Sequence, residues 1–158
     1  TFQLLTQAAG RAGRGDRPGE VVIQTYDPEH YAIEASAAQD YEAFYEKEIR
    51  YRSLMGYPPV ENLMAVLAAC EDEALLEKAC KYLKEYILRI KGQAQLNVIG
   101  PASPGVDKIK DIYRRVVYVK APEYRTLVVL KDRMEQYIEI NSGFQKMRIQ
   151  FDFNPMNL

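Results

Sequence analysis

Cysteine and histidine are scarce in this sequence, which contains two cysteines and one histidine among 158 residues. Cys70 and Cys80 stand ten positions apart, outside any metal-binding spacing, and we expect both to be small buried hydrophobic residues of a protein in the reducing cytoplasm. His30 has no second candidate ligand nearby, which argues against a metal or catalytic role. No nucleophile–base pair or paired carboxylates stand out, which argues against the enzyme classes that depend on them.

Long apolar runs and a strong net charge are also missing. No apolar run approaches the roughly 18 residues needed to span a bilayer, and no signal peptide opens the sequence, so we expect no membrane association. The net charge of −1 gives no overall reason to expect nucleic acid as a partner. Any such case has to come from local charge.

From residue 61 onward, strand and helix patterns alternate. We predict strands at 62–70, 96–100, 113–120 and 147–153, and helices at 72–91 and 122–140. In the first of these helices, apolar residues recur at three- and four-residue spacing: Leu76, Ala79, Leu83, Ile87 and Ile90. The order βαββαβ indicates an α+β fold of the split-βαβ type, with both helices on one face of a mainly antiparallel sheet.

The first 60 residues have a different pattern. An apolar helix at 1–9 leads into a glycine- and arginine-rich turn at 10–19. Residues 20–26 (EVVIQTY) are rich in β-branched side chains and predict a buried strand. A helical pattern at 27–55 ends at Gly56-Tyr57-Pro58-Pro59, because proline cannot continue a helix. We place the domain boundary near Gly56, and we expect the aromatic series of this helical region to pack as a core: Tyr41, Phe44, Tyr45, Tyr51 and Tyr57.

The strongest chemical pattern is Gln7-Ala8-Ala9-Gly10-Arg11-Ala12-Gly13-Arg14. Glycine lets the backbone approach another surface closely, and the two arginines lie three residues apart. Guanidinium groups suit phosphate oxygens, and an arginine placed across a domain interface can neutralise the charge of a transferred phosphoryl group. The residues alone also permit a basic turn that is simply solvated.

With its flanks, this pattern resembles motif VI of superfamily 2 helicases. The segment TFQLLTQAAGRAGRGDRPGEVVIQTYDPEH is similar to the primosomal replication-restart helicase family PriA (primosomal protein N′). The resemblance continues through EIRYRSLMGYPP (48–59), GPASP (100–104) and Tyr113-Arg114, and so covers essentially the whole chain.

This resemblance implies an architecture and a function. Residues 1–27 would end a RecA-like helicase lobe, 28–60 would form a helical connector, and 61–158 would be a ribosomal-protein-S10-like domain. The full-length protein would be an ATP-dependent 3′-to-5′ DNA helicase that restarts stalled replication forks and starts primosome assembly. Its partners would be forked and single-stranded DNA, single-stranded-DNA-binding protein and other primosome proteins.

The resemblance also assigns residues. Gln7, Gly10, Arg11 and Arg14 would face ATP, with Arg11 and Arg14 catalytic and Arg14 the arginine finger. The Walker A lysine, the Walker B acids and the zinc-binding cysteines of the family are absent, so ATP, Mg²⁺ and zinc would bind in a longer protein, and we expect the chain alone to be inactive. Asn154 stands where the family usually has a second aspartate.

A second candidate site is locally basic. Six cations lie in residues 108–125: Lys108, Lys110, Arg114, Arg115, Lys120 and Arg125. Lysine and arginine can neutralise DNA phosphates, and Tyr113 offers a ring on which a base can stack. A solvated loop and an exposed strand face would give the same composition, and the resemblance to PriA favours DNA binding by Lys108, Lys110, Tyr113, Arg114 and Arg115. The alternative function is a stand-alone split-βαβ module that binds RNA or ribosomal partners without catalysis.

Overall fold

The computed structural model describes residues 1–12 and 19–155. The chain divides into two compact units, Thr1–Met55 and Gly56–Leu158.

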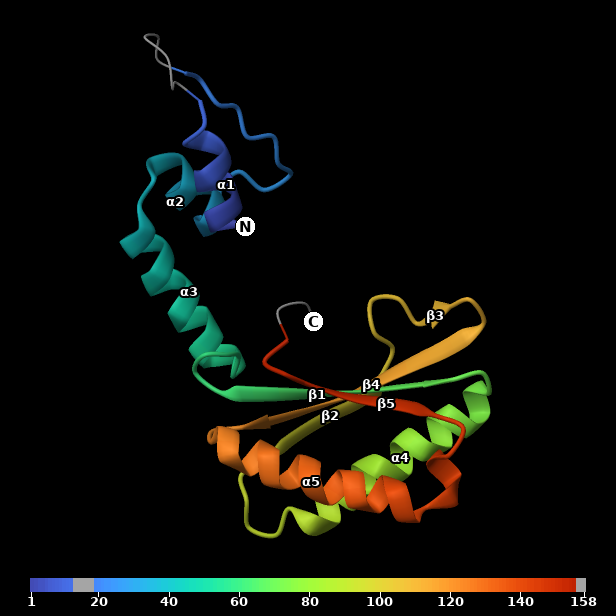
Figure 1. The fold of residues 1–158 in the computed structure, drawn as a ribbon. Coiled ribbons are helices and arrows are strands. Elements are labelled where there is room, and N and C mark those ends of the chain that lie inside the picture. The colour runs from blue at the N-terminus through green and yellow to red at the C-terminus, as the bar shows by residue number, and fades with distance from the viewer. Residues whose placement is uncertain (13–18, 156–158) are drawn as a thin grey trace. The chain divides into compact units, whose positions relative to one another are not determined.

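The second unit has the predicted α+β order with one additional strand. Its elements are β1 (Asn62–Cys70), α4 (Glu73–Ile90), β2 (Asn97–Ala102), β3 (Lys108–Ile109), β4 (Ile112–Ala121), α5 (Tyr124–Ile140), the 3₁₀ turn η1 (Ser142–Phe144) and β5 (Arg148–Phe153). The sheet order is β2-β4-β1-β5, β3 pairs with β4, and every pair is antiparallel. Both helices cover the same face of the sheet (Figure 1), as the sequence predicted.

Alternation along the strands separates the two faces of this sheet. Met64 and Val66 of β1 point to the helices and pack with Leu83 and Ile87 of α4. Leu127 and Met134 of α5 complete the same core and are fully buried. Successive side chains of β1 point to opposite faces, and because this strand is apolar after its first residue, residues of its other face such as Ala65 are buried as well. The amphipathic helices supply an apolar stripe that matches the helix face.

The side chain of Asp72 caps the start of α4. Asp72 lies just before the helix in an extended conformation, and its Oδ1 accepts a hydrogen bond from the backbone N–H of Leu75 at 2.9 Å. This N-cap satisfies one of the free amides of the first helical turn.

The first unit contains three helices, α1 (Phe2–Ala9), α2 (Tyr31–Ala38) and α3 (Tyr41–Met55). The continuous helical pattern predicted for residues 27–55 is interrupted at Gln39, whose backbone is left-handed at φ 55°, and Asp40 then caps α3 through Ala43 N. His30 caps α2, because its Nδ1 accepts from Ala32 N at 3.1 Å.

Two sequence expectations for this unit are wrong. The strand predicted at 20–26 is absent, and Val22 is 85% exposed. A strand needs a neighbour to hydrogen-bond, and the described part of this unit supplies helices only. The prediction that the aromatic series packs as a core is also wrong for Tyr41 and Tyr45, whose side chains are more than half exposed. Phe44 does pack inside the unit, with its ring centre 4.5 Å from that of Phe2. The predicted end of a RecA-like lobe stays a prediction.

Candidate nucleic-acid interface

The hairpin joining β3 to β4 carries the first predicted DNA-binding residues. Lys110 and Asp111 form its two-residue turn between Ile109 and Ile112, and both have positive φ, 48° and 63°. Two successive left-handed residues match the twist of a tight hairpin. The turn leaves Lys110 exposed at its tip.

Lys108 is held beside this turn. Its Nζ lies 2.9 Å from Asp111 Oδ1 and 4.7 Å from the centre of the Tyr113 ring. Hydrogen bonds to Asp111 and to Tyr113 raise the pKa of Lys108, so the ammonium stays charged at neutral pH. The same contact covers one face of the Tyr113 ring, which is half-buried.

Arg114 and Arg115 separate to opposite faces of the sheet because successive side chains of a strand alternate. Arg114 lies opposite Ala69 on the helix-free face, and its Nη1 donates to the carbonyl of Val106 at 3.3 Å. Arg115 lies opposite Ala68 on the helix face.

Arg115 is bound by two carboxylates of α4. Its guanidinium lies 2.7 Å from Glu73 Oε1 and 3.0 Å from Glu77 Oε2, and only 14% of its side chain is exposed. Partial burial by itself would lower the pKa of Arg115, but the hydrogen bonds to Glu77 and Glu73 outweigh it and raise the pKa. This arginine joins α4 to β4.

The structure adds a cation that the sequence argument missed. Arg148 of β5 also lies opposite Ala69, on the other side of β1 from Arg114. The two arginines therefore flank a small residue in one row of the helix-free face, about 10 Å apart at their Cα atoms. Within residues 1–12 and 19–155, neither arginine forms an ion pair with a carboxylate.

Lys146 and Arg148 also line a hollow of about 600 Å³ with Ile112 at this end of the sheet, together with Glu71 and Asp72. The period-two pattern of MRIQFDF and the strand order of a split-βαβ sheet were the signals that could have placed Arg148 beside Arg114. The basic surface thus extends from the hairpin to β5.

The residues expected at ATP are only partly described. Gln7 lies near the end of α1, Gly10 follows as the C-cap with φ −66°, and both are exposed, as is Arg11. Arg14 lies outside the described residues. Nothing in this geometry tests a nucleotide-binding role.

No cluster of three or more histidine, cysteine, aspartate or glutamate side chains in the described chain could hold a metal ion. Among the described helices, none is both long and apolar enough to cross a membrane. Cys70 and Cys80 are buried free thiols, and burial raises the pKa of Cys80 to about 11.

Comparison with known proteins identifies the family of this chain. Residues 53–156 match the family described as "Primosomal protein N C-terminal domain". A protein of Bacillus subtilis (strain 168) named "Replication restart protein PriA" is 34% identical over 155 residues, which cover 98% of this chain and 19% of the relative. Proteins of the same name are 33% identical over 157 residues in Synechocystis (99% of this chain and 18% of the relative) and 37% over 123 residues in Thermotoga maritima (78% and 16%).

The chain spans about a fifth of the length of these curated relatives. The alignments with the first two run over nearly all of it, on both sides of Gly56. The chain belongs to the Primosomal protein N C-terminal domain family, which confirms the resemblance to PriA found in the sequence.

Proposed function

We propose that this chain is the C-terminal portion of an ATP-dependent 3′-to-5′ DNA helicase that restarts stalled replication forks and starts primosome assembly. The family match and the relatives named replication restart protein support this proposal. The alternative, a stand-alone module for RNA or ribosomal partners, is not favoured by the same findings. In the full-length protein, Gln7, Gly10, Arg11 and Arg14 would contact ATP, Mg²⁺ would be held with the nucleotide by residues outside this chain, and zinc would bind upstream.

Within the full-length protein, the unit Gly56–Leu158 binds single-stranded and forked DNA through the basic surface that runs from the β3–β4 hairpin to β5. The observation that carries this is the row Arg114–Ala69–Arg148 on the helix-free face. Two guanidinium groups beside a small side chain leave room for a phosphate chain to approach the sheet, and guanidinium groups match phosphate geometry well. Lys110 extends the positive charge at the tip of the hairpin, whereas Lys108 lies opposite Tyr113 and is paired with Asp111.

Arg115 has a structural role in this proposal. Its guanidinium is engaged by Glu73 and Glu77, so moving it to a phosphate would leave two carboxylates without their partner. It therefore contributes little to DNA affinity and serves as a matched control. Other partners of the full-length protein are single-stranded-DNA-binding protein and further primosome proteins, in the cytoplasm.

The test is a salt-dependent titration of a fluorescent single-stranded oligonucleotide with the 158-residue chain. Phosphate contacts release counterions with a slope of about 0.7 per contact in a plot of log affinity against log salt. Replacing Lys110, Arg114 and Arg148 by alanine should lower that slope by about 2 and weaken binding at low salt.

Arg115→Ala is the control, and it should leave both affinity and slope nearly unchanged. It should nevertheless destabilise the fold by roughly 1–3 kcal/mol, because two charge-assisted hydrogen bonds are lost. If the triple variant binds DNA as the parent does, or if Arg115→Ala weakens binding as strongly as the triple variant, the proposed surface is wrong.

A further inference from the structure

β5 (Arg148–Phe153) forms an open edge of the sheet. In the order β2-β4-β1-β5 it pairs with β1 on one side, and no strand pairs with its other side within the described chain. An edge strand presents unpaired backbone N–H and C=O groups, and an extended peptide can add to such an edge as a further strand. Within the described chain, β5 therefore has a strand partner on one side only.

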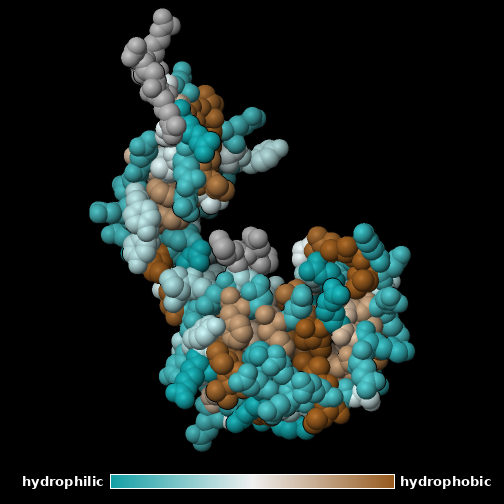
Figure 2. Space-filling model, viewed as in Figure 1, coloured by the Kyte–Doolittle hydropathy of each residue, from teal (hydrophilic) through white to brown (hydrophobic). Residues whose placement is uncertain are grey.

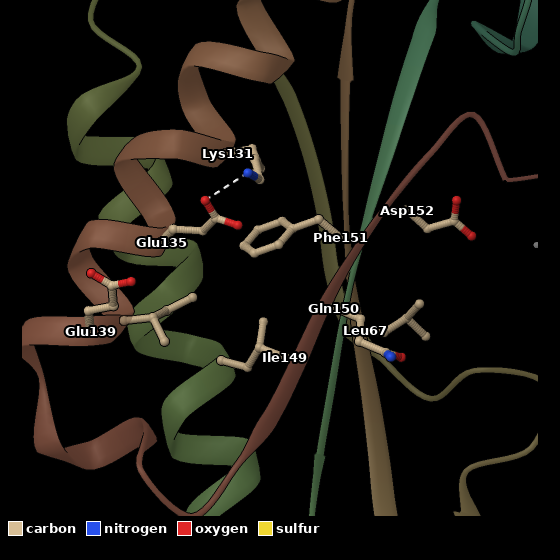
Figure 3. Close-up of a pocket in the computed structure, with 9 residues that line it drawn as sticks. Leu67, Lys131, Glu135, Glu139, Ile149, Gln150, Phe151 and Asp152 are labelled. Carbon is tan, nitrogen blue, oxygen red and sulfur yellow. Dashed lines mark ion pairs between the residues drawn. The ribbon is translucent and has the colours of Figure 1, made fainter.

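A hollow of about 660 Å³ follows this open edge. Ile149 and Phe151 of β5 point toward α5, whereas Gln150 and Asp152 lie on the other side of the strand (Figure 3). Side chains from both sides of β5 therefore line the hollow, which places it along the strand edge. In the space-filling view, hydrophobic side chains are interspersed with hydrophilic ones over the region of α5 and β5 (Figure 2).

The charge of the lining is negative. Glu135 and Glu139 extend from α5, Asp152 comes from β5, and Lys131 is the single cation among them. Lys131 is already engaged, since its Nζ lies 2.7 Å from Glu135 and 3.5 Å from Asp132. Glu139 and Asp152 are exposed and form no ion pair within the described residues.

We propose that the β5 edge is a docking site for an extended basic peptide of a protein partner, in which apolar residues alternate with lysine or arginine. The peptide backbone pairs with β5, its apolar side chains contact Ile149 and Phe151 on the helix face, and its cations lie beside Asp152 on the other face. The carboxylate of Glu139 on α5 adds to the negative potential that attracts a basic peptide. An alternating pattern suits the edge because successive side chains of an added strand face opposite sides of the sheet.

The negative lining also separates this site from the DNA surface, since phosphates are repelled by Glu135, Glu139 and Asp152. The charge on the surface changes from positive to negative along β5. Arg148 lies in the row with Arg114 that we propose binds DNA, whereas the negative Asp152 lies four residues further along the strand. The proposal does not depend on the DNA-binding surface, because neither Glu139 nor Asp152 belongs to it.

The probe is the terminally blocked peptide Lys-Val-Lys-Val-Lys-Val-Lys-Val, titrated into the ¹⁵N-labelled 158-residue chain. Amide signals of residues 148–153 and 131–139 are expected to shift, and the N-methylated version of the peptide should bind much more weakly because it cannot pair with a strand edge. A Glu-Val peptide of the same length should not bind.

The charge-reversed variant Glu139→Lys/Asp152→Lys should weaken binding by tenfold or more. Glu85→Lys/Glu123→Lys carries the same change of net charge on exposed positions of this unit that do not line the hollow, and it should bind as the parent does. Equal binding by both variants, shifts confined to other residues, or tight binding of the acidic peptide or of single-stranded DNA at this edge overturns the proposal. Concentration-dependent dimerisation through residues 148–153 overturns it too, because the occupant is then a second copy of the chain.

Discussion

At the residue scale, Asn154 holds the end of β5 against β1. Its backbone N–H donates to Leu63 O at 2.7 Å, its side-chain Oδ1 accepts from Leu63 N at 2.8 Å, and its φ is 49°. Asparagine tolerates a left-handed backbone better than most residues. The position therefore requires a side-chain acceptor and a left-handed backbone, and an aspartate oxygen could accept the same bond.

We predict that Asn154→Ala lowers the free energy of unfolding by roughly 2 kcal/mol, because it loses one hydrogen bond and places alanine at positive φ. Asn154→Gly should cost about half as much, since glycine adopts this backbone without strain. Asn154→Asp, which keeps the acceptor, should cost least. Urea unfolding of the three variants measures the order, and equal losses for alanine and glycine would contradict the role given to φ.

Gly100 has a left-handed backbone and a close backbone neighbour, and both disfavour a residue with a side chain. Its φ is +106°, and a Cβ there would lie 2.7 Å from the carbonyl oxygen of Val116 on the neighbouring strand. That neighbour is backbone and cannot move aside. We predict that Gly100→Ala destabilises the chain by about 2 kcal/mol or more, from strain and overlap together.

Gly105→Ala is the matched control, because a Cβ at Gly105 would meet nothing within 4 Å. Thermal unfolding of the two variants should separate them clearly. A melting temperature for Gly100→Ala equal to that of Gly105→Ala would mean that the strand shifts to accommodate the methyl group.

At the element scale, a tyrosine–carboxylate–arginine chain joins α2 to α3. Tyr31 of α2 donates to Glu48 Oε2 of α3, and Arg52 Nε donates to Glu48 Oε1 at 2.6 Å. Burial and the bond to Glu48 raise the pKa of Tyr31 to about 12. Partial burial alone would raise the pKa of Glu48, but hydrogen bonds from Tyr31 and Arg52 outweigh it and lower the pKa below 4.5.

Because the pKa of Glu48 is lower in the fold than in the unfolded chain, the stabilisation that Glu48 contributes is fully present above about pH 4.5. It is lost as the pH falls through the folded-state pKa. We predict a Glu48 pKa below 4.5 in a ¹³C-carboxyl NMR titration and a higher one in Tyr31→Phe. Tyr45→Phe should leave the Glu48 pKa where it is; a Tyr31→Phe value equal to the parent's would remove Tyr31 as a cause.

The elements that the sequence predicted are those with a strong internal pattern. β1 was predicted at its observed bounds. The bounds of α4 and α5 were predicted to within two residues at each end, because their apolar residues recur at helical spacing over many residues. β3 was missed because its turn is Lys110-Asp111, without the glycine or asparagine that usually marks such a hairpin. The strand expected at 20–26 failed because β-branched composition does not supply the neighbouring strand.

At the scale of the whole molecule, the candidate site depended on information that a linear sequence holds only in part. Lys108, Lys110 and Arg114 were found as a run of charge. Arg115 looked equivalent to Arg114 until the register placed it on the helix face beside Glu73 and Glu77. Arg148, 34 residues beyond Arg114, joined the surface because β1 pairs with both β4 and β5.

The helicase family that the sequence resembles uses Walker A and Walker B residues to hold phosphates and Mg²⁺, and these 158 residues contain neither set. We predict that the purified chain neither binds nor hydrolyses ATP measurably, even with DNA present, because arginines can stabilise a transferred phosphoryl group only where other residues hold the phosphates and Mg²⁺. DNA-stimulated phosphate release by the purified chain would contradict this.

In the full-length protein, Arg14→Ala should lower ATP turnover by roughly 10³-fold or more, as expected for an arginine finger. DNA affinity measured without nucleotide should change little, because the proposed DNA surface lies in the unit that begins at Gly56. Arg17→Ala removes the same charge from the same glycine-rich segment but lies outside the motif, so its turnover should fall far less. Turnover of Arg14→Ala within a few-fold of the parent, or equal losses for the two variants, would show that Arg14 is not the finger and that the segment acts through its charge alone.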